Sequence, residues 1–175
     1  MSFRRVGGRE AWKGRILAVR EDRFVYDDDG EEVTREIVDH PGAVAVVAHD
    51  GERLYLVAHA REAVDEPELL ELPAGKLDEE GESPLDAAKR ELAEEIGLNA
   101  RTWQHLTTCY SSPGFTNETM HLYLATDLHE ADSERDESER MELRPVPLTE
   151  LDATIRECRD AKTLIGLLWL KAFLA

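Results

Sequence analysis

The sequence has few of the features that mark secreted or membrane proteins. It contains two cysteines, Cys109 and Cys158, which form no CxxC pair, so we expect buried or half-buried thiols in a reducing compartment. The N-terminal residues lack the apolar core of a signal peptide. The most apolar run, residues 164–174, is too short to span a bilayer and carries Lys171. These absences predict a soluble cytoplasmic protein.

Basic residues are also scarce, with 21 Lys and Arg against 38 Asp and Glu, a net charge of −17. The electric field of so many negative charges would repel the phosphate backbone of a nucleic acid or an anionic membrane. We therefore expect neither a nucleic-acid nor a membrane partner. A negatively charged substrate would need local cations, from a metal or from arginine. The length of 175 residues and the hydrophobic fraction of 42% fit one domain with its own core and a short N-terminal appendage.

The order of predicted elements indicates an α/β fold with a mixed sheet flanked by helices. Residues 1–11 are expected to be a mobile arm, and residues 61–67 a polar loop. Turns are predicted at residues 27–30 (DDDG) and at Asp50-Gly51. Strands are predicted at 12–26, 31–39, 42–49, 53–58, 69–75, 103–110, 120–127 and 141–146, and C-terminal helices at 149–158 and 160–174. We expect residues 1–39 to form a small N-terminal β subdomain and residues 40–175 the main domain.

The most informative stretch is residues 75–98, GKLDEEGESPLDAAKRELAEEIGL. Ser83 suits a helix N-cap, Pro84 the first helical position and Gly97 the C-terminal stop. Within this helix an apolar stripe recurs at helical spacing, formed by Leu85, Ala88, Leu92 and Ile96. In the last helix, Leu164, Leu167, Leu168 and Leu170 are expected to face the core.

Three glutamates, Glu91, Glu94 and Glu95, stand beside the stripe. Like charges at these spacings cost a helix about 0.2–0.5 kcal/mol per pair, and a divalent cation would relieve the repulsion. Hard oxygen ligands suit Mg²⁺ or Mn²⁺. The alternative is a solvated acidic helix face, which is common in a chain this rich in glutamate.

The neighbouring residues favour the metal. Glu82, a gap of seven residues, and the run RELAEEIGL at residues 90–98 resemble the signature of the Nudix hydrolases. The resemblance implies a Nudix-type α/β/α sandwich with a mixed sheet. One departure is that Gly75 and Glu82 have six residues between them, where the family pattern has five. Either the loop carries one extra residue or the turn glycine is displaced.

The resemblance also implies roles for residues of this stretch. Glu91, Glu94 and Glu95 would bind metal, together with the backbone carbonyl of Ala74. Glu82 and Arg90 would form a structural salt bridge that holds the loop against the helix. Metal ions about 3.5–4 Å apart would bind phosphate oxygens and lower the pKa of a bound water, as cleavage of a phosphoanhydride requires.

Substrate choice is expected to come from outside this stretch. The segment SPGFTNE at residues 112–118 resembles that of the bacterial ADP-ribose pyrophosphatase subfamily, which implies that Pro113, Gly114 and Glu118 contact substrate. The alternative is an ordinary turn, because Pro and Gly form turns in every fold. Arg61 lies where family members place an arginine that contacts the diphosphate, with a plain surface arginine as the alternative.

Candidates for the general base and for the adenine contacts lie in other parts of the chain. The subfamily places its base in an acidic loop before a strand, which implies Glu137, with Glu139 as second choice; the alternative is a solvated loop. Trp12, Phe24 and Arg35 are candidates for stacking on adenine. In the resembling enzymes the N-terminal subdomain is exchanged across a homodimer, so a homodimer is expected here.

Together with the acidic helix face, the resemblance implies a Mg²⁺-dependent hydrolase that converts ADP-ribose to AMP and ribose 5-phosphate. One alternative keeps the enzyme class and changes the substrate to another nucleoside diphosphate sugar or derivative. A second is a non-catalytic Nudix module that binds ADP-ribose, and a third is an acidic structural protein with an incidental motif.

Overall fold

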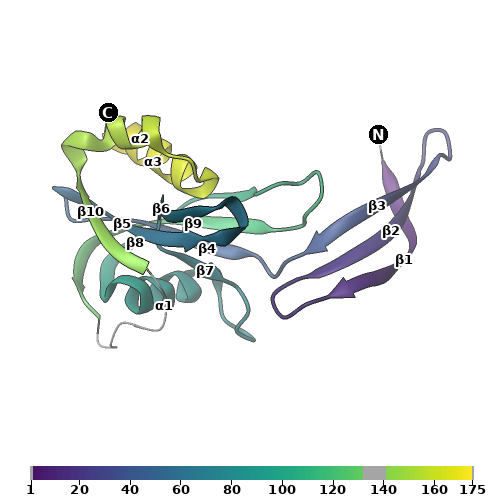
Figure 1. The fold of residues 1–175 in the computed structure, drawn as a ribbon, viewed down its shortest axis with the longest axis horizontal. Helices are drawn as coiled ribbons and strands as arrows, with labels where there is room; N and C mark the ends of the chain where they lie inside the picture. The colour runs from purple at the N-terminus through teal and green to yellow at the C-terminus, as the bar shows by residue number, and fades with distance from the viewer. Residues whose placement is uncertain (1, 132–140, 175) are drawn as a thin grey trace. The chain divides into compact units, whose positions relative to one another are not determined.

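The computed structural model describes residues 2–131 and 141–174 of the chain (Figure 1). The chain divides into two compact units. The first contains Met1–Gly42 together with Tyr110–Thr119, and the second contains Ala43–Cys109 and Met120–Ala175. We expected a division after residue 39. The structure adds to the N-terminal unit the segment that holds the SPG turn.

The N-terminal unit is built on a three-stranded antiparallel sheet in the order β1 (Phe3–Lys13), β2 (Ala18–Tyr26) and β3 (Glu32–Asp39). The expectation of a mobile arm at residues 1–11 was wrong, because β1 pairs with β2 along its whole length. Irregularities in register, between Arg5 and Gly7 and between Glu10 and Trp12, break the alternation that would reveal a strand. The turn at residues 27–30 is confirmed, with Gly30 at a φ of 74°.

The second unit contains a seven-stranded mixed sheet in the order β10-β5-β4-β9-β8, with β6 paired to β5 and β7 to β4. Its strands are β4 (Ala43–His49), β5 (Arg53–Arg61), β6 (Glu66–Glu71), β7 (Ala74–Lys76), β8 (Leu98–Tyr110), β9 (Thr119–Glu130) and β10 (Met141–Pro147). β4 pairs with β9 in parallel and with β5 antiparallel. The predicted mixed sheet is confirmed.

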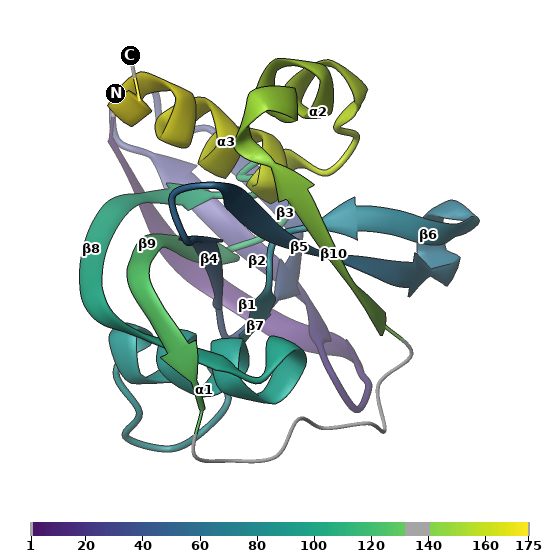
Figure 2. The same ribbon diagram turned by 90° about the vertical axis from the view of Figure 1, so that its left-hand side faces the viewer.

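Helix α1 (Pro84–Ile96) covers one face of this sheet, and α2 (Leu151–Glu157) and α3 (Ala161–Leu174) cover the other (Figures 1 and 2). Side chains of β4 point alternately to the two faces of the sheet, so this strand contacts the helices on both sides. Val44 and Val46 pack in a cluster with Leu92 and Ile96 of α1. The intervening β4 side chains, with Leu167 and Leu170 of α3, belong to the opposite cluster. The second unit is therefore an α/β/α sandwich, as predicted.

The predicted strand at residues 69–75 is in fact two strands. β6 pairs with β5, and β7 pairs with β4, because the chain crosses between them at Pro73, which has no N–H to donate to a ladder. The carbonyl of Pro73 still accepts a hydrogen bond from the N–H of Val46, at 2.9 Å. The loop expected at residues 61–67 contains a 3₁₀ turn, η1 (Glu62–Val64), and the start of β6.

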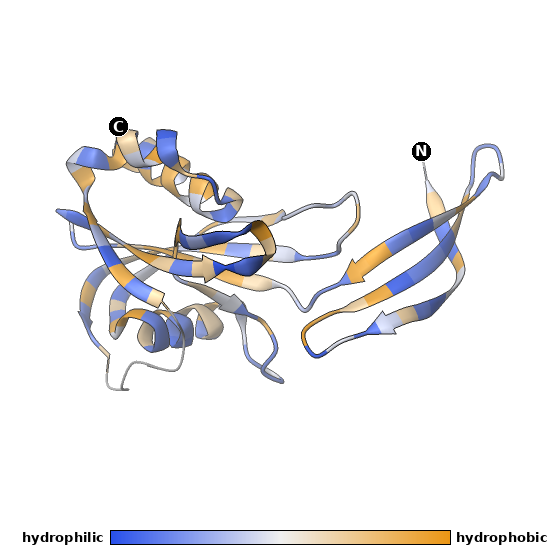
Figure 3. Ribbon diagram, in the orientation of Figure 1, coloured by the Kyte–Doolittle hydropathy of each residue, from blue (hydrophilic) through white to orange (hydrophobic). Residues whose placement is uncertain are grey.

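Helix α3 follows a second 3₁₀ turn, η2 (Leu148–Glu150), and α2. Leu167 and Leu170 are buried as expected, but Leu168 is 49% exposed, so its placement in the core was wrong. Much of α3 is hydrophobic (Figure 3), and an apolar pattern on all sides cannot indicate which face is inward. Within the described residues, no helix is both long and apolar enough to cross a membrane.

Candidate active site

Helix α1 begins and ends where the sequence predicts. Ser83 Oγ accepts a hydrogen bond from the N–H of Asp86 at 3.2 Å and donates one to the Asp86 carboxylate at 2.6 Å. At the other end Gly97 has a φ of 71°, and its N–H bonds to the carbonyl of Ala93 at 2.9 Å. These two caps fix which helical positions face β7.

Strand β7 lies directly against two of the glutamates. A Cβ placed on Gly75 would be 1.9 Å from the Glu91 carboxyl carbon, so only glycine allows this approach. The carboxylate of Glu95, which is 7% exposed, accepts a hydrogen bond from the N–H of Ala74 at 3.1 Å. The structure therefore brings together Ala74, Gly75, Glu91 and Glu95.

Arg90 joins the loop to the acidic face of α1. Its Nε and Nη2 donate to both oxygens of Glu82, at 3.0 and 2.9 Å. Its Nη1 donates to Glu91 at 2.7 Å and to Glu94 at 3.1 Å. The hydrogen bonds to Glu82 are the largest cause of a raised pKa of Arg90, so the guanidinium remains charged among these carboxylates.

The donor chemistry of this site fits a hard divalent cation, because it offers carboxylate oxygens beside the backbone of β7. The geometry is only partly assembled. Across residues 2–131 and 141–174, no three Asp, Glu, His or Cys side chains are gathered closely enough to hold an ion. Arg90 instead bridges Glu91 and Glu94, and Glu94 is the most exposed of the three glutamates, with 44% of its side chain accessible.

The loop between Gly75 and Glu82 turns at its C-terminal end. The N–H of Glu82 bonds to the carbonyl of Glu79 at 3.3 Å, and Gly81 has a φ of 82°. Gly75 itself lies in β7, where its contact with Glu91 requires a glycine.

Arg61 lies at the end of β5 and donates two hydrogen bonds to Glu71, at 2.6 and 2.8 Å. Glu71 is 2% exposed and also accepts from Lys162 of α3. Burial acts to raise the pKa of Glu71, but the bonds from Arg61 and Lys162 outweigh it and lower the pKa. Sequence reasoning missed these partners; the available signal was a glutamate between two apolar residues, Leu70 and Leu72, in a predicted strand.

The N-terminal unit contains a pocket of about 420 Å³ that is lined by several of the predicted substrate residues. Phe24 and Arg35 line it, as do Pro113 and Gly114 of the SPG turn. Arg35 donates to the carbonyl of Thr34 at 2.9 Å. Further lining comes from the aromatic rings of Phe3 and Tyr26 and from Arg20. The pocket thus combines flat apolar surfaces with guanidinium groups.

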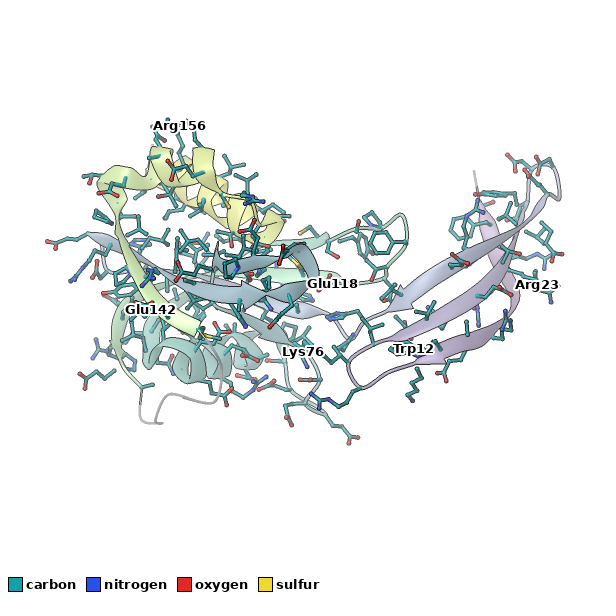
Figure 4. The ribbon with its side chains drawn as sticks, viewed as in Figure 1. Trp12, Arg23, Lys76, Glu118, Glu142 and Arg156 are labelled. Atoms are coloured by element: carbon teal, nitrogen blue, oxygen red, sulfur yellow. The ribbon has the colours of Figure 1, made fainter. Side chains whose placement is uncertain are left out.

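Trp12 and Glu118 do not line this pocket. Trp12 lies on β1 with 56% of its surface exposed (Figure 4), and its ring packs against Gly14, where a Cβ would approach it to 2.2 Å. Glu118 accepts a hydrogen bond from Ser111 and lies 3.5 Å from Nδ1 of His40. These contacts lie outside the lining of the pocket.

The two candidates for the general base, Glu137 and Glu139, lie outside the described residues. The chain is described again from β10, where Glu142 forms an ion pair with Arg144 (Figure 4).

Comparison with known proteins gives consistent matches. The NUDIX domain family matches residues 39–165. An ADP-ribose pyrophosphatase of Bacillus subtilis is 37% identical over 170 residues, which cover 93% of this chain and 89% of that protein. An ADP-ribose pyrophosphatase of Mycobacterium tuberculosis is 43% identical over 128 residues, or 73% of this chain; the match spans only 61% of that longer protein.

Among solved structures, one described as an ADP compounds hydrolase superposes with a TM-score of 0.85 at 22% identity, covering 99% of this chain and 95% of that one. This likeness concerns the fold. The family match over most of the chain, the relative from Bacillus subtilis and the glutamates of α1 beside Gly75 lead to one conclusion: the chain belongs to the Nudix hydrolase family.

Proposed function

We propose that this protein is a Mg²⁺-dependent hydrolase that adds water across the pyrophosphate bond of ADP-ribose and releases AMP and ribose 5-phosphate. The main support for a hydrolase is the arrangement of two glutamates of α1 against β7. The Glu91 carboxylate packs on Gly75, and Glu95 accepts a hydrogen bond from the N–H of Ala74. The names of the relatives from Bacillus subtilis and Mycobacterium tuberculosis support ADP-ribose as the substrate.

In this proposal Ala74, Glu91, Glu94 and Glu95 hold the cation. When bound, it supplies positive charge to the phosphate oxygens and makes a water more acidic. Arg90 keeps the loop closed on α1 through Glu82. The oxygen of water attacks one phosphorus, the bond from that phosphorus to the bridging oxygen breaks, and Arg61 binds the charge that develops on the phosphates.

The general base is proposed to be Glu137 or, failing that, Glu139. A carboxylate can take the proton of the attacking water once that water has become acidic. The pH–rate profiles of Glu137→Gln and Glu139→Gln test this assignment. The variant that lacks the base should lose most of its kcat, and its pH–rate profile should lose the acidic limb. If both variants keep full kcat, the base is another residue.

The pocket of the N-terminal unit supports an adenine site within this proposal. Phe24 offers a ring for stacking and Arg35 a planar cation, and both are common partners of nucleotide bases. Pro113 and Gly114 would contact the same nucleotide. Trp12 and Glu118 remain weaker candidates, since neither lines the pocket. The homodimer and the cytoplasmic location also belong to this proposal; the free thiols of Cys109 and Cys158 are compatible with a reducing compartment.

A substrate panel tests the proposal. The purified protein is incubated with ADP-ribose, GDP-mannose, UDP-glucose and NADH in Mg²⁺ or Mn²⁺, and the products are separated by chromatography. We expect the highest kcat/KM for ADP-ribose in Mg²⁺, with AMP and ribose 5-phosphate in equal amounts. A higher kcat/KM for another member of the panel would contradict the assignment of ADP-ribose and make that compound the proposed substrate. Calorimetric binding of ADP-ribose without hydrolysis would instead indicate a non-catalytic module.

A further inference from the structure

Four charged side chains link the start of α3 to the ends of β5 and β6. We name them the Glu71 cluster: Arg61, Glu71, Asp160 and Lys162. Glu71 stands at the centre with 2% of its surface exposed, and only 14% of the Lys162 side chain is exposed. The two carboxylates and the two cations give the cluster no net charge. A buried carboxylate such as that of Glu71 needs a cationic partner of this kind, because its burial without one is costly.

The contacts within the cluster run in series. Asp160 lies 3.0 Å from Nζ of Lys162, and Lys162 donates to Glu71. Glu71 then accepts the two parallel hydrogen bonds from Nε and Nη2 of Arg61. A bidentate pair of this kind fixes the plane of the guanidinium as well as its position.

A second connection holds the same elements together. The carboxylate of Asp160 accepts from the backbone N–H and the hydroxyl of Thr163, at 3.0 and 2.6 Å. The Thr163 hydroxyl oxygen in turn accepts from the N–H of Leu72 at 2.8 Å. The N-terminus of α3 is therefore bonded both to the side chain of Glu71 and to the backbone of the next residue, close in the sequence to Ala74.

The cluster adjoins the proposed catalytic site. The hydrogen bond with Glu71 raises the pKa of Arg61 against the effect of burial, and Glu95 also contributes to the rise. The backbone gives a direct link, because the Leu72 N–H that bonds to Thr163 lies two residues before Ala74, whose N–H bonds to Glu95. The Arg61 side chain is 39% exposed, and the bonds to Glu71 use two of its five N–H groups. The remaining groups suit an incoming phosphate.

We propose that Lys162 and Asp160 are positioning residues that act through Glu71 to orient the Arg61 guanidinium toward the diphosphate of the substrate. This inference rests on the proposed function of the same site. Without Lys162, Glu71 keeps a single cationic partner, and the fork of Arg61 is free to turn toward the side that Lys162 occupied. The substrate would then meet a misoriented cation, although Arg61 itself is unchanged.

The first test compares Lys162→Met with Lys171→Met. Lys171 lies on the same helix and also forms an ion pair, with Asp152 at 2.7 Å, but it has no connection to Glu71 among the described contacts. We expect Lys162→Met to raise the KM for ADP-ribose about tenfold and Lys171→Met to leave it unchanged. Lys162→Arg should restore most of the affinity. Equal effects of the two methionine variants would overturn the inference.

A double-mutant cycle separates positioning from a general loss of stability. If Lys162 acts through Arg61, Lys162→Met should have little further effect on KM in an Arg61→Met background. Multiplicative effects of the two substitutions would contradict the inference. If Lys162→Met does not fold, as judged by its melting curve, Lys162→Gln takes its place in the cycle with the same two outcomes.

Binding of ADP, followed by calorimetry without divalent metal, gives a readout that does not depend on turnover. The same cycle should show the same coupling there. If the wild-type protein hydrolyses ADP-ribose but the cycle shows independent effects in both assays, only the positioning role fails. If the wild-type protein turns over none of the panel substrates, the proposed function itself fails.

Discussion

Gly75 illustrates what single residues contribute to this site. The signature marks Gly75 as a turn glycine, but its backbone is not in the left-handed region, and its freedom of conformation is not the reason for its presence. The reason is steric: a Cβ added to Gly75 would clash with the carboxyl carbon of Glu91, at a distance of 1.9 Å. The residue type could be read from the sequence, whereas the partner that requires it lies sixteen positions away.

Gly75→Ala should therefore impair catalysis more than folding. The added methyl group would displace the Glu91 carboxylate, so we expect kcat/KM to fall by about 100-fold or more, because ligands misplaced by an ångström lose much of their effect. Steady-state kinetics with a melting curve would measure both properties.

Gly81→Ala is the matched control for this substitution. Gly81 has a φ of 82°, and no atom lies within 4 Å of the position that an added methyl group would take. Alanine there should cost about 1 kcal/mol of stability through backbone strain. Its kcat/KM should stay near that of the wild type. An equal loss of activity in both variants would mean that Gly75 acts through loop conformation.

Asp50 carries a second prediction for a single residue, concerning pH. The hydrogen bond from the Tyr55 hydroxyl, at 2.7 Å, is the largest cause that lowers the pKa of Asp50 from 3.8 to about 2. A carboxylate whose pKa is lower in the folded state stabilises the fold above its unfolded pKa. That contribution disappears as the pH falls from about 4 to about 2.

We expect Asp50→Asn to reduce the free energy of unfolding by about 1–2 kcal/mol at pH 7, since charged hydrogen bonds are lost from the turn. The difference from the wild type should shrink toward pH 2. Urea denaturation at several pH values measures it, with Glu52→Gln in the same turn as a control. A difference that is constant from pH 7 to pH 2 would contradict the role assigned to the ionised carboxylate.

Among the elements, α1 was the most predictable and β1 the least. Ser83, Pro84 and Gly97 act locally, so the ends of α1 follow from the sequence. β1 depends on pairing with β2 through an irregular register, which no local pattern shows. For α3 the helix was predictable but its inward face was not, because that face depends on contacts with residues far away in the sequence. A Cβ added to Gly166, for example, would lie 2.5 Å from a Leu72 methyl carbon.

The cap of α1 gives a prediction for one element. Ser83→Ala removes the acceptor of the Asp86 N–H, so the free energy of unfolding should fall by about 1 kcal/mol. Ser83→Asp keeps an acceptor at the same position and should retain most of that stability. Thermal unfolding of both variants tests the cap, and equal losses would show that the hydroxyl stabilises the helix in some other way.

The inward face of α3 gives a second prediction for one element. Leu167 is fully buried, so Leu167→Ala should cost about 2–5 kcal/mol. Leu168 is 49% exposed, and Leu168→Ala should change stability by about 0.5 kcal/mol or less. Urea denaturation would distinguish them. A large loss for Leu168→Ala would mean that another surface covers this side of the helix in solution.

For the whole molecule, the order of strands and helices in the sequence predicted a mixed sheet flanked by helices, because each element has a local pattern. The metal ligands, which the family resemblance implies, stay a prediction. The sequence did not predict the Glu71 cluster, because Glu71 and Lys162 are 91 residues apart and neither stands in a recognisable motif. The net charge of −17 explains why such pairing matters. An anionic substrate must find a cation that is oriented toward it, and most arginines of the described chain already face carboxylates.

The central claim is that the carboxylates held against β7 make this protein an ADP-ribose hydrolase. The most direct test is the rate of AMP release from ADP-ribose in Mg²⁺ by the wild type, Glu91→Gln and Glu80→Gln, the last an exposed loop glutamate that serves as control. We predict wild-type rates for Glu80→Gln and a loss of about 1,000-fold or more for Glu91→Gln with an unchanged melting curve. Near-normal turnover by Glu91→Gln would contradict the account.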